Sequence, residues 1–239
     1  MIVSLDNFYH SHLYFVPART EKEKLVGLEI VANFVTEDGN VRMPTELVMP
    51  RLSAEEQRCL FEEKLALLET CQHFFIQHKL IAWINLTPAP AVVASLLSDG
   101  EFVSHVRRFP FLELMINENY PELSLGKENQ ILAELAGRFP LILANFGAGD
   151  TSIKAIFDGL FKRVALDKNF VQQRSASLSF EPFMQAIISQ ISPCCDSIMI
   201  AGIDTEEMLA RISSMGFSAL QGCLWPAVPA SQVTTLVQG

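Results

Sequence analysis

Leu-Ile-Leu-Ala-Asn-Phe-Gly-Ala-Gly-Asp, residues 141–150, is an apolar run that breaks into a glycine-rich turn. A short apolar run bounded by glycines predicts a buried strand, and Gly147 and Gly149 permit the backbone angles of a tight turn. In a barrel of alternating strands and helices, a turn from strand to helix lies on the face that carries the chemistry. Ala144 and Asn145 leave the strand here, and neither can carry a negative charge. The stretch therefore has the form of an active-site loop without its acids.

Short β-rich runs alternate with helical patterns along the rest of the chain. We count eight predicted strands, at residues 13–17, 25–35, 81–86, 111–116, 141–146, 163–166, 197–201 and 217–220. Such alternation implies parallel βαβ units, and eight strands favour a closed barrel over an open sheet. At 239 residues the chain has the length of one such barrel, typically about 250 residues. We therefore predict an α/β fold, a modified (β/α)8 TIM-like barrel, as a single domain over residues 1–239.

Helix signals divide the segments between these strands. Ser53 and Glu56 form a predicted capping box that opens a helix ending near residue 79. Residues 43–50 are predicted to be an irregular link, residues 88–103 one helical segment, and residues 151–160 a further helix. Three aspartates are predicted to be capping or turn groups rather than acids of a site, namely Asp150, Asp167 and Asp204.

Composition limits the classes of function. A formal net charge of −9 argues against direct binding to nucleic acid, because phosphate contacts need clustered Lys and Arg. Charged residues make up 19% of the chain, below the roughly 25% of ordinary soluble domains, so part of the surface is expected to be apolar and to suit a protein partner. Residues 1–10 do not have the form of a secretory signal, and no uncharged apolar run is long enough to span a membrane. We predict a cytoplasmic protein.

The predicted strand exits carry few groups that could do chemistry. Glu29 is the only strong candidate for a metal ligand, since a glutamate within an apolar strand is costly unless it is paired or binds a metal. Asn85 and Gln221 are amides that could orient a ligand, or could equally belong to a polar network of the barrel mouth. Cleavage of a phosphoester by two metal ions needs several anions around a pair of cations. One carboxylate and two amides do not supply that charge.

At these exits the sequence resembles the EAL domain family, phosphodiesterases that linearise cyclic di-GMP on a modified barrel with two metal ions. Residues 27–31, Gly-Leu-Glu-Ile-Val, stand where the family has its Glu-Ala-Leu signature, so Glu29 matches the first metal-binding glutamate. Residues 84–87, Ile-Asn-Leu-Thr, are similar to the family's Val-Asn-Leu-Ser and keep its asparagine as Asn85. Gln221 also matches the family pattern.

The other family positions are replaced. The resemblance places Met115 where the family has a metal-binding glutamate, and Ala144 and Asn145 where it has two metal-binding aspartates. Ala165 stands in place of the catalytic lysine, and Ala201 in place of another acid. The resemblance therefore implies a degenerate domain with no catalytic residue, no metal and no cofactor, in which Glu29, Asn85, Asn145 and Gln221 remain as a vestigial pocket.

Within the family, the chain is most similar to a stand-alone enterobacterial member without catalysis. That resemblance implies binding to the FlhD subunit of the flagellar master activator FlhD-FlhC, weaker binding of the activator to DNA, and repression of flagellar genes and motility. It implies no direct contact with nucleic acid or membrane, and no binding of cyclic di-GMP. The alternative is a weak cyclic di-GMP phosphodiesterase or a nucleotide sensor that uses Glu29, Asn85 and Gln221.

Overall fold

A computed structural model describes residues 1–86, 88–149 and 153–237. Two compact units make up the chain, and each combines segments that are distant in sequence. The first unit contains residues 1–16, 28–112 and 227–239, and the second contains residues 17–27 and 113–226.

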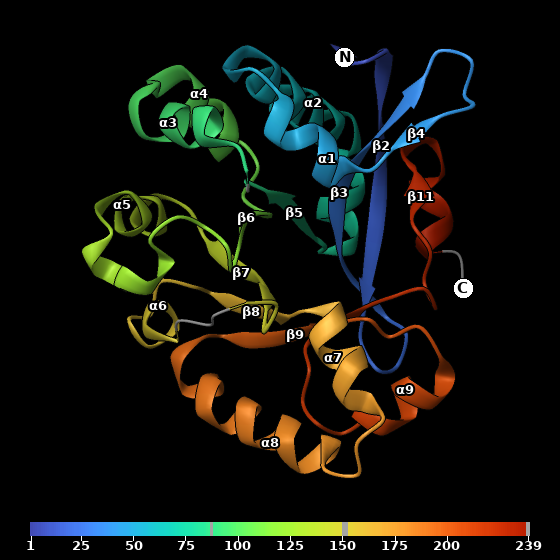
Figure 1. The fold of residues 1–239 in the computed structure, drawn as a ribbon, viewed down its shortest axis with the longest axis vertical. Helices are drawn as coiled ribbons and strands as arrows, with labels where there is room; N and C mark the ends of the chain where they lie inside the picture. Colours follow the sequence, from blue (N-terminus) through green and yellow to red (C-terminus); the bar gives the residue numbers. More distant parts are fainter. Residues whose placement is uncertain (87, 150–152, 238–239) are drawn as a thin grey trace. The chain divides into compact units, whose positions relative to one another are not determined.

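The first unit holds the N-terminal strands, a long helix and the C-terminal segment (Figure 1). Its elements are β1 (Ile2–Ser4), most of β2 (Phe8–Arg19) and β3 (Leu25–Thr36), β4 (Arg42–Met43), α1 (Thr45–Val48), η1 (Met49–Arg51), α2 (Ala54–His78), β5 (Ile81–Asn85), α3 (Pro90–Ser98), α4 (Gly100–Arg107), β11 (Val228–Pro229) and η4 (Ala230–Val237). The strands β3 and β5 are neighbours, and β2 pairs with β3. The predicted hairpin of residues 13–17 and 25–35 is thus confirmed, with longer strands.

Helix α2 is the main packing element of the first unit. The Ser53 hydroxyl accepts a hydrogen bond from the Glu56 backbone N–H, and the Glu56 side chain accepts one from the Ser53 backbone N–H, which confirms the predicted capping box. The apolar face of the helix is buried, and Phe75 contacts Phe15 of β2 with 6.0 Å between ring centroids. The local sequence therefore specifies where the helix starts, and packing against the sheet holds the helix in place.

The second unit contains the parallel strands and the helices between them. Its elements are most of β6 (Leu112–Asn117), η2 (Leu123–Glu128), α5 (Gln130–Arg138), β7 (Leu141–Phe146), α6 (Lys154–Phe157), β8 (Arg163–Leu166), α7 (Lys168–Ser175), α8 (Phe180–Ile191), η3 (Ser192–Cys194), β9 (Ser197–Ala201), α9 (Glu206–Ile212) and β10 (Ala219–Gln221). Strands β6 to β10 pair in parallel in that order. Most of their residues are buried on both faces, as in parallel sheets covered by helices. The predicted βαβ units are confirmed here.

The described residues form eleven strands rather than the eight predicted. The additional strands β1, β4 and β11 have two or three residues each, too few to show an alternating pattern in the sequence. They pair antiparallel with β2 or β3. Strand β2 also pairs antiparallel with β10, through Arg19 and Leu220.

Several helix predictions were wrong in detail. The segment predicted as one helix over residues 88–103 is divided at Asp99, whose side chain caps α4 by accepting a hydrogen bond from the Phe102 backbone N–H. Residues 45–51 are helical, not an irregular link. Of the predicted helix 151–160, residues 151 and 152 lie outside the described residues, and helix α6 spans four of the remaining ones. Asp150, predicted to be a capping or turn group, lies outside the described residues.

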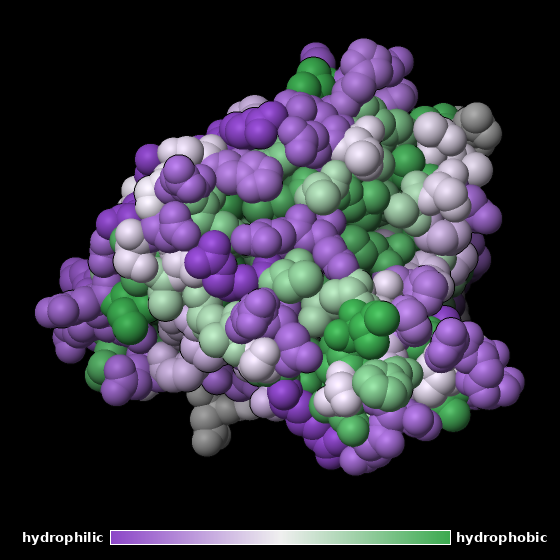
Figure 2. Space-filling model, turned by 90° about the horizontal axis from the view of Figure 1, so that it is seen from above, coloured by the Kyte–Doolittle hydropathy of each residue, from purple (hydrophilic) through white to green (hydrophobic). Residues whose placement is uncertain are grey.

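Apolar side chains remain on the surface of both units. Figure 2 shows them gathered in several places among hydrophilic residues on one face. The most exposed large apolar side chains include Ile2, Phe8 and Leu47 in the first unit, and Ile131, Phe157 and Leu178 in the second. Among the described helices, none has the length and apolar character that a membrane crossing requires.

Candidate functional site

The carboxyl ends of the parallel strands in the second unit carry mostly apolar side chains. Met115, Ala144 and Ala165 are buried there. Ala201 ends β9 and lies in register with Gln221 at the end of β10, and both are half-buried. At these four positions no carboxylate and no lysine is present. Of the two predicted pocket residues in this unit, Gln221 lies within regular strand pairing and Asn145 does not.

Asn145 leaves β7 in an unusual conformation. Its φ is +57°, in the left-handed region that Asn tolerates better than most residues. The pairing of β7 with β8 shifts register between Leu143 and Phe146, so the strand is irregular around Asn145. The side chain is exposed. An amide in this place can donate and accept hydrogen bonds but adds no charge for a cation.

Glu118 lies beside this turn, and its side chain accepts hydrogen bonds from the turn itself. Its Oε2 atom accepts hydrogen bonds from the backbone N–H groups of Gly147 at 3.0 Å and Gly149 at 2.9 Å. Glu118 and Gly149 border a cavity of about 370 Å³, which Asn117, Asn119, Asn145 and Ala148 also line. Gly147 also packs closely against Phe170 of α7, because a Cβ on Gly147 would lie 2.6 Å from the Phe170 ring. Glu118 therefore holds the loop in shape, a role that the sequence reading did not assign.

Asp204 joins three segments at the strand exits of the second unit. One carboxylate oxygen accepts a hydrogen bond from Gln172 at 2.6 Å and lies 3.2 Å from the Lys168 ammonium, both on α7. The other accepts the Cys223 backbone N–H at 2.8 Å. Burial would raise the pKa of Asp204, but these hydrogen bonds outweigh burial and hold the pKa below its usual value. Asp204 was predicted to be a capping or turn group, and the capping alternative is wrong, because Thr205 caps α9.

Replacing Asp204 with Asn is expected to lower the free energy of unfolding by about 1–3 kcal/mol near neutral pH, because charge-assisted hydrogen bonds are lost. The folded pKa lies below the usual 3.8, so this contribution is complete above that value and is lost as pH falls through the folded pKa. Urea unfolding of both chains at neutral and acid pH measures it. The difference in stability should close on acidification, and a difference independent of pH would contradict the ionic role.

Asp167 has the role that the sequence predicts. It is buried, and its side chain accepts a hydrogen bond from the Phe170 backbone N–H at the start of α7. Helix α7 itself was not predicted. Its residues Lys-Asn-Phe-Val-Gln-Gln-Arg-Ser are mostly polar and give no clear apolar stripe.

Glu29 and Asn85 belong to the first unit, on the neighbouring strands β3 and β5. Both are half-buried. A buried lysine, Lys64 of α2, interacts electrostatically with Glu29. Burial lowers the pKa of Lys64 to about 8, while the negative charge of Glu29 opposes that shift. Lys64 was not predicted to be a site residue, although a lysine four residues from both Leu60 and Leu68 stands on the apolar stripe of the helix.

The donor atoms at the predicted site do not fit a pair of divalent cations. In the part of the chain that the structure describes, no three or more His, Cys, Asp or Glu side chains are grouped so that they could hold a metal ion. Hard cations such as Mg²⁺ take oxygen ligands, carboxylates above all, whereas the strand ends of the second unit offer methyl groups, a thioether and amides.

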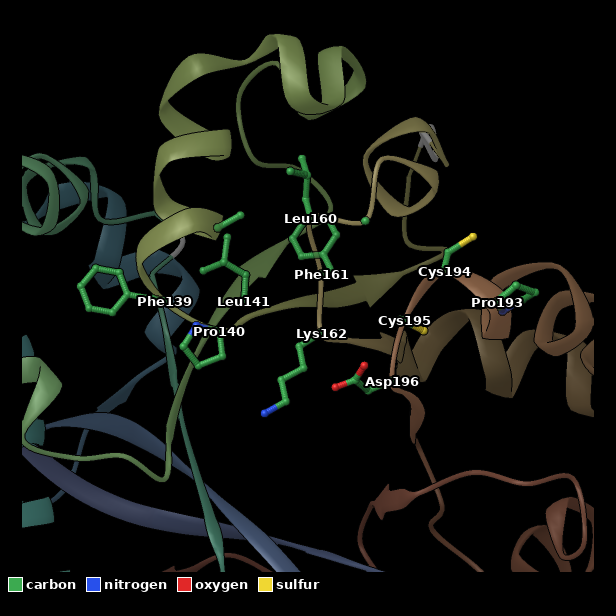
Figure 3. Close-up of a pocket in the computed structure, with 12 residues that line it drawn as sticks. Phe139, Pro140, Leu141, Leu160, Phe161, Lys162, Pro193, Cys194, Cys195 and Asp196 are labelled. Atoms are coloured by element: carbon green, nitrogen blue, oxygen red, sulfur yellow. The ribbon is translucent and has the colours of Figure 1, made fainter.

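A second cavity, of about 430 Å³, lies at the opposite ends of the strands in the second unit. The segments that precede β7, β8 and β9 line it. Figure 3 shows Lys162 and Asp196 at this cavity, and the Asp196 backbone N–H donates to the Lys162 carbonyl oxygen at 2.8 Å. Nearby, the buried Glu113 carboxylate accepts hydrogen bonds from Arg163 Nε at 2.9 Å and Nη2 at 3.3 Å. It also lies 3.1 Å from the Lys162 ammonium. Residues at this end of barrel strands usually serve stability.

Comparison with known proteins gives a consistent family. The family model described as "EAL domain" matches residues 6–227. The protein named "Anti-FlhC(2)FlhD(4) factor YdiV" of Salmonella typhimurium strain LT2 is 68% identical over 238 residues, which cover 100% of both chains. In Escherichia coli strain K12, the "Putative anti-FlhC(2)FlhD(4) factor YdiV" is 54% identical, also over 100% of both chains.

Solved structures agree. The crystal structure of the EAL-like domain protein YdiV has a TM-score of 0.90 at 54% identity, and the match covers 99% of this chain and 100% of that one. A complex of the phosphodiesterase PaMucR with c-di-GMP has a TM-score of 0.68 at 17% identity, over 92% and 93% of the two chains. This second likeness concerns the fold alone. The predicted fold class, an α/β TIM-like barrel of the EAL type, is confirmed.

Proposed function

This chain belongs to the EAL domain family, and we propose that it is a member without catalytic activity that works by binding another protein. The proposed partner is the FlhD subunit of the flagellar activator FlhD-FlhC. Binding would weaken the grip of the activator on promoter DNA and so repress flagellar genes and motility. The observation that carries this proposal is the full-length identity of 68% to a protein named as an anti-FlhC(2)FlhD(4) factor.

The strand ends support the absence of catalysis. By the family pattern, Met115, Ala144, Asn145 and Ala201 stand where metal-binding acids are needed, and Ala165 where the catalytic lysine is needed. The first two and Ala165 are buried, so water does not readily supply the missing ligands at these places. A two-metal site works by stabilising charge on the attacking and leaving oxygens. Without anions to hold the ions, that stabilisation is lost.

We propose that the polar groups retained in the two units are vestigial. Glu29, Asn85, Asn145 and Gln221 are the retained or isosteric polar groups, and we assign them no metal, cofactor or cyclic di-GMP. We also propose that residues 1–239 form a single EAL domain, because the family model runs through both compact units. The proposed location is the cytoplasm, where a transcription activator acts.

Surface composition supports a protein partner. Stable interfaces bury about 800 Å² on each partner and have an apolar core. Exposed side chains such as Phe8 in the first unit and Leu178 in the second are of the type that such cores contain. The net charge of −9 favours action through the activator protein over competition for its DNA.

A reconstituted assay tests this function. The purified chain is expected to co-elute with the FlhD-FlhC complex in gel filtration and to release it from promoter DNA in a mobility-shift experiment. With Mg²⁺ or Mn²⁺ added, no hydrolysis of cyclic di-GMP is expected. If the chain hydrolyses cyclic di-GMP, loses that activity on Glu29→Ala and leaves the activator on its DNA, the phosphodiesterase alternative replaces the proposal.

A further inference from the structure

Two histidines alternate on one face of strand β2. His10 and His12 are two residues apart, and successive side chains of a strand point to opposite faces, so both imidazoles lie on the same face. His12 is exposed and His10 is half-buried. A strand rises only about 3.3 Å per residue. Two imidazoles that are two residues apart on one face can therefore reach a common ion.

Two of the strands that pair with β2 end short of His12. Strand β1 pairs with β2 up to Ile2 opposite His10, and β11 pairs from Pro229 opposite Tyr14, so neither of these two strands covers His12. Ser11, between the histidines, points to the other face and donates its hydroxyl to Glu63 of α2 at 2.8 Å. That carboxylate is therefore engaged on the far side of the strand.

We propose that His10 and His12 form an open site for a divalent transition-metal ion, with water in the remaining positions. Imidazole suits Zn²⁺, Cu²⁺ and Ni²⁺, whereas Mg²⁺ and Mn²⁺ prefer carboxylate and carbonyl oxygens. The side chains of β1, β2 and β11 that share this face, namely Ile2, Ser4, Phe8, Tyr14 and Pro229, carry no carboxylate. Two imidazole ligands favour ions that accept nitrogen, and the site differs from the two-metal chemistry of the family in its residues and its ion.

Calorimetric titration of the full chain with Ni²⁺ tests the site. Ni²⁺ is the probe because the exposed thiols of Cys59 and Cys223 compete more strongly for Cu²⁺ and Zn²⁺. The wild-type chain is expected to bind Ni²⁺, and both His10→Asn and His12→Asn are expected to lose that binding. His73→Asn removes another exposed histidine, on α2, and is expected to bind as the wild type does.

Two controls complete the experiment. Circular dichroism establishes that each variant is folded, which surface substitutions should preserve, and Mg²⁺ is expected to give no heat in any chain. Binding of Ni²⁺ that survives either His10→Asn or His12→Asn overturns the proposal, as does a wild-type chain that takes up no Ni²⁺. The outcome is independent of activator binding, so failure here leaves the proposed function standing.

Discussion

Replacing Gly222 with Ala is expected to prevent folding or to lower the free energy of unfolding by about 4 kcal/mol or more. A Cβ at this position would lie 2.0 Å from the Ile203 carbonyl oxygen, 2.4 Å from its carbon and 2.5 Å from the Ile203 nitrogen. All three atoms are backbone, and hydrogen bonds hold them, because the Ile203 N–H donates to Gln221 and its carbonyl accepts from Leu224. Neither segment can move without breaking these contacts. Urea unfolding followed by circular dichroism measures the loss.

Gly137 provides the matched control. It lies in α5, and a Cβ there would meet nothing within 4 Å. Gly137→Ala is therefore expected to leave the chain folded and to stabilise it by up to about 1 kcal/mol, the difference in helix propensity. If Gly222→Ala unfolds at the same urea concentration as Gly137→Ala, the close approach of the two loops is wrong.

The second large effect is expected at Glu113. Replacing it with Gln removes the negative charge that pairs with Arg163 and Lys162, and leaves the mostly buried Arg163 guanidinium without that counter-charge. Breaking a buried pair by removing one partner costs about 3–5 kcal/mol. Urea unfolding at neutral pH again gives the free energy.

Glu69→Gln separates this effect from the general loss of a surface charge. Glu69 lies 2.8 Å from Arg108, and both side chains are about half exposed. Exposed pairs contribute about 0–1 kcal/mol, so this variant is expected to be nearly as stable as the wild type. Equal losses from the two substitutions would show that burial of Glu113 has no special consequence.

Local signals predicted much of the fold. The strands at 141–146, 163–166 and 197–201 have the predicted bounds, because apolar runs between turn residues leave little choice. The start of α2 was predicted for a similar reason, since the capping box lies within four residues of sequence. Where neighbours in sequence make the contacts, the sequence alone is informative.

The missed features depend on contacts between distant residues. Asp204 has the local pattern of a cap, but its partners Gln172 and Cys223 lie 32 and 19 residues away, and they decide its role. Glu113 and Arg163 are 50 residues apart, and nothing in either segment indicates that they pair. The identities at the strand ends could be read from the family pattern, whereas the work of Glu118 in holding the glycine turn required the structure.

The packing around the strand ends bears on how this chain could evolve. Met115, Ala144 and Ala165 are buried, so a single substitution by a charged residue at any of them would bury a charge, which is costly unless that charge is paired. Each such substitution would lower stability, and only a full set of acids could offset that loss by binding an ion. Single substitutions that place a charge at these strand ends are therefore opposed by their cost in stability, whereas substitutions at exposed positions are not.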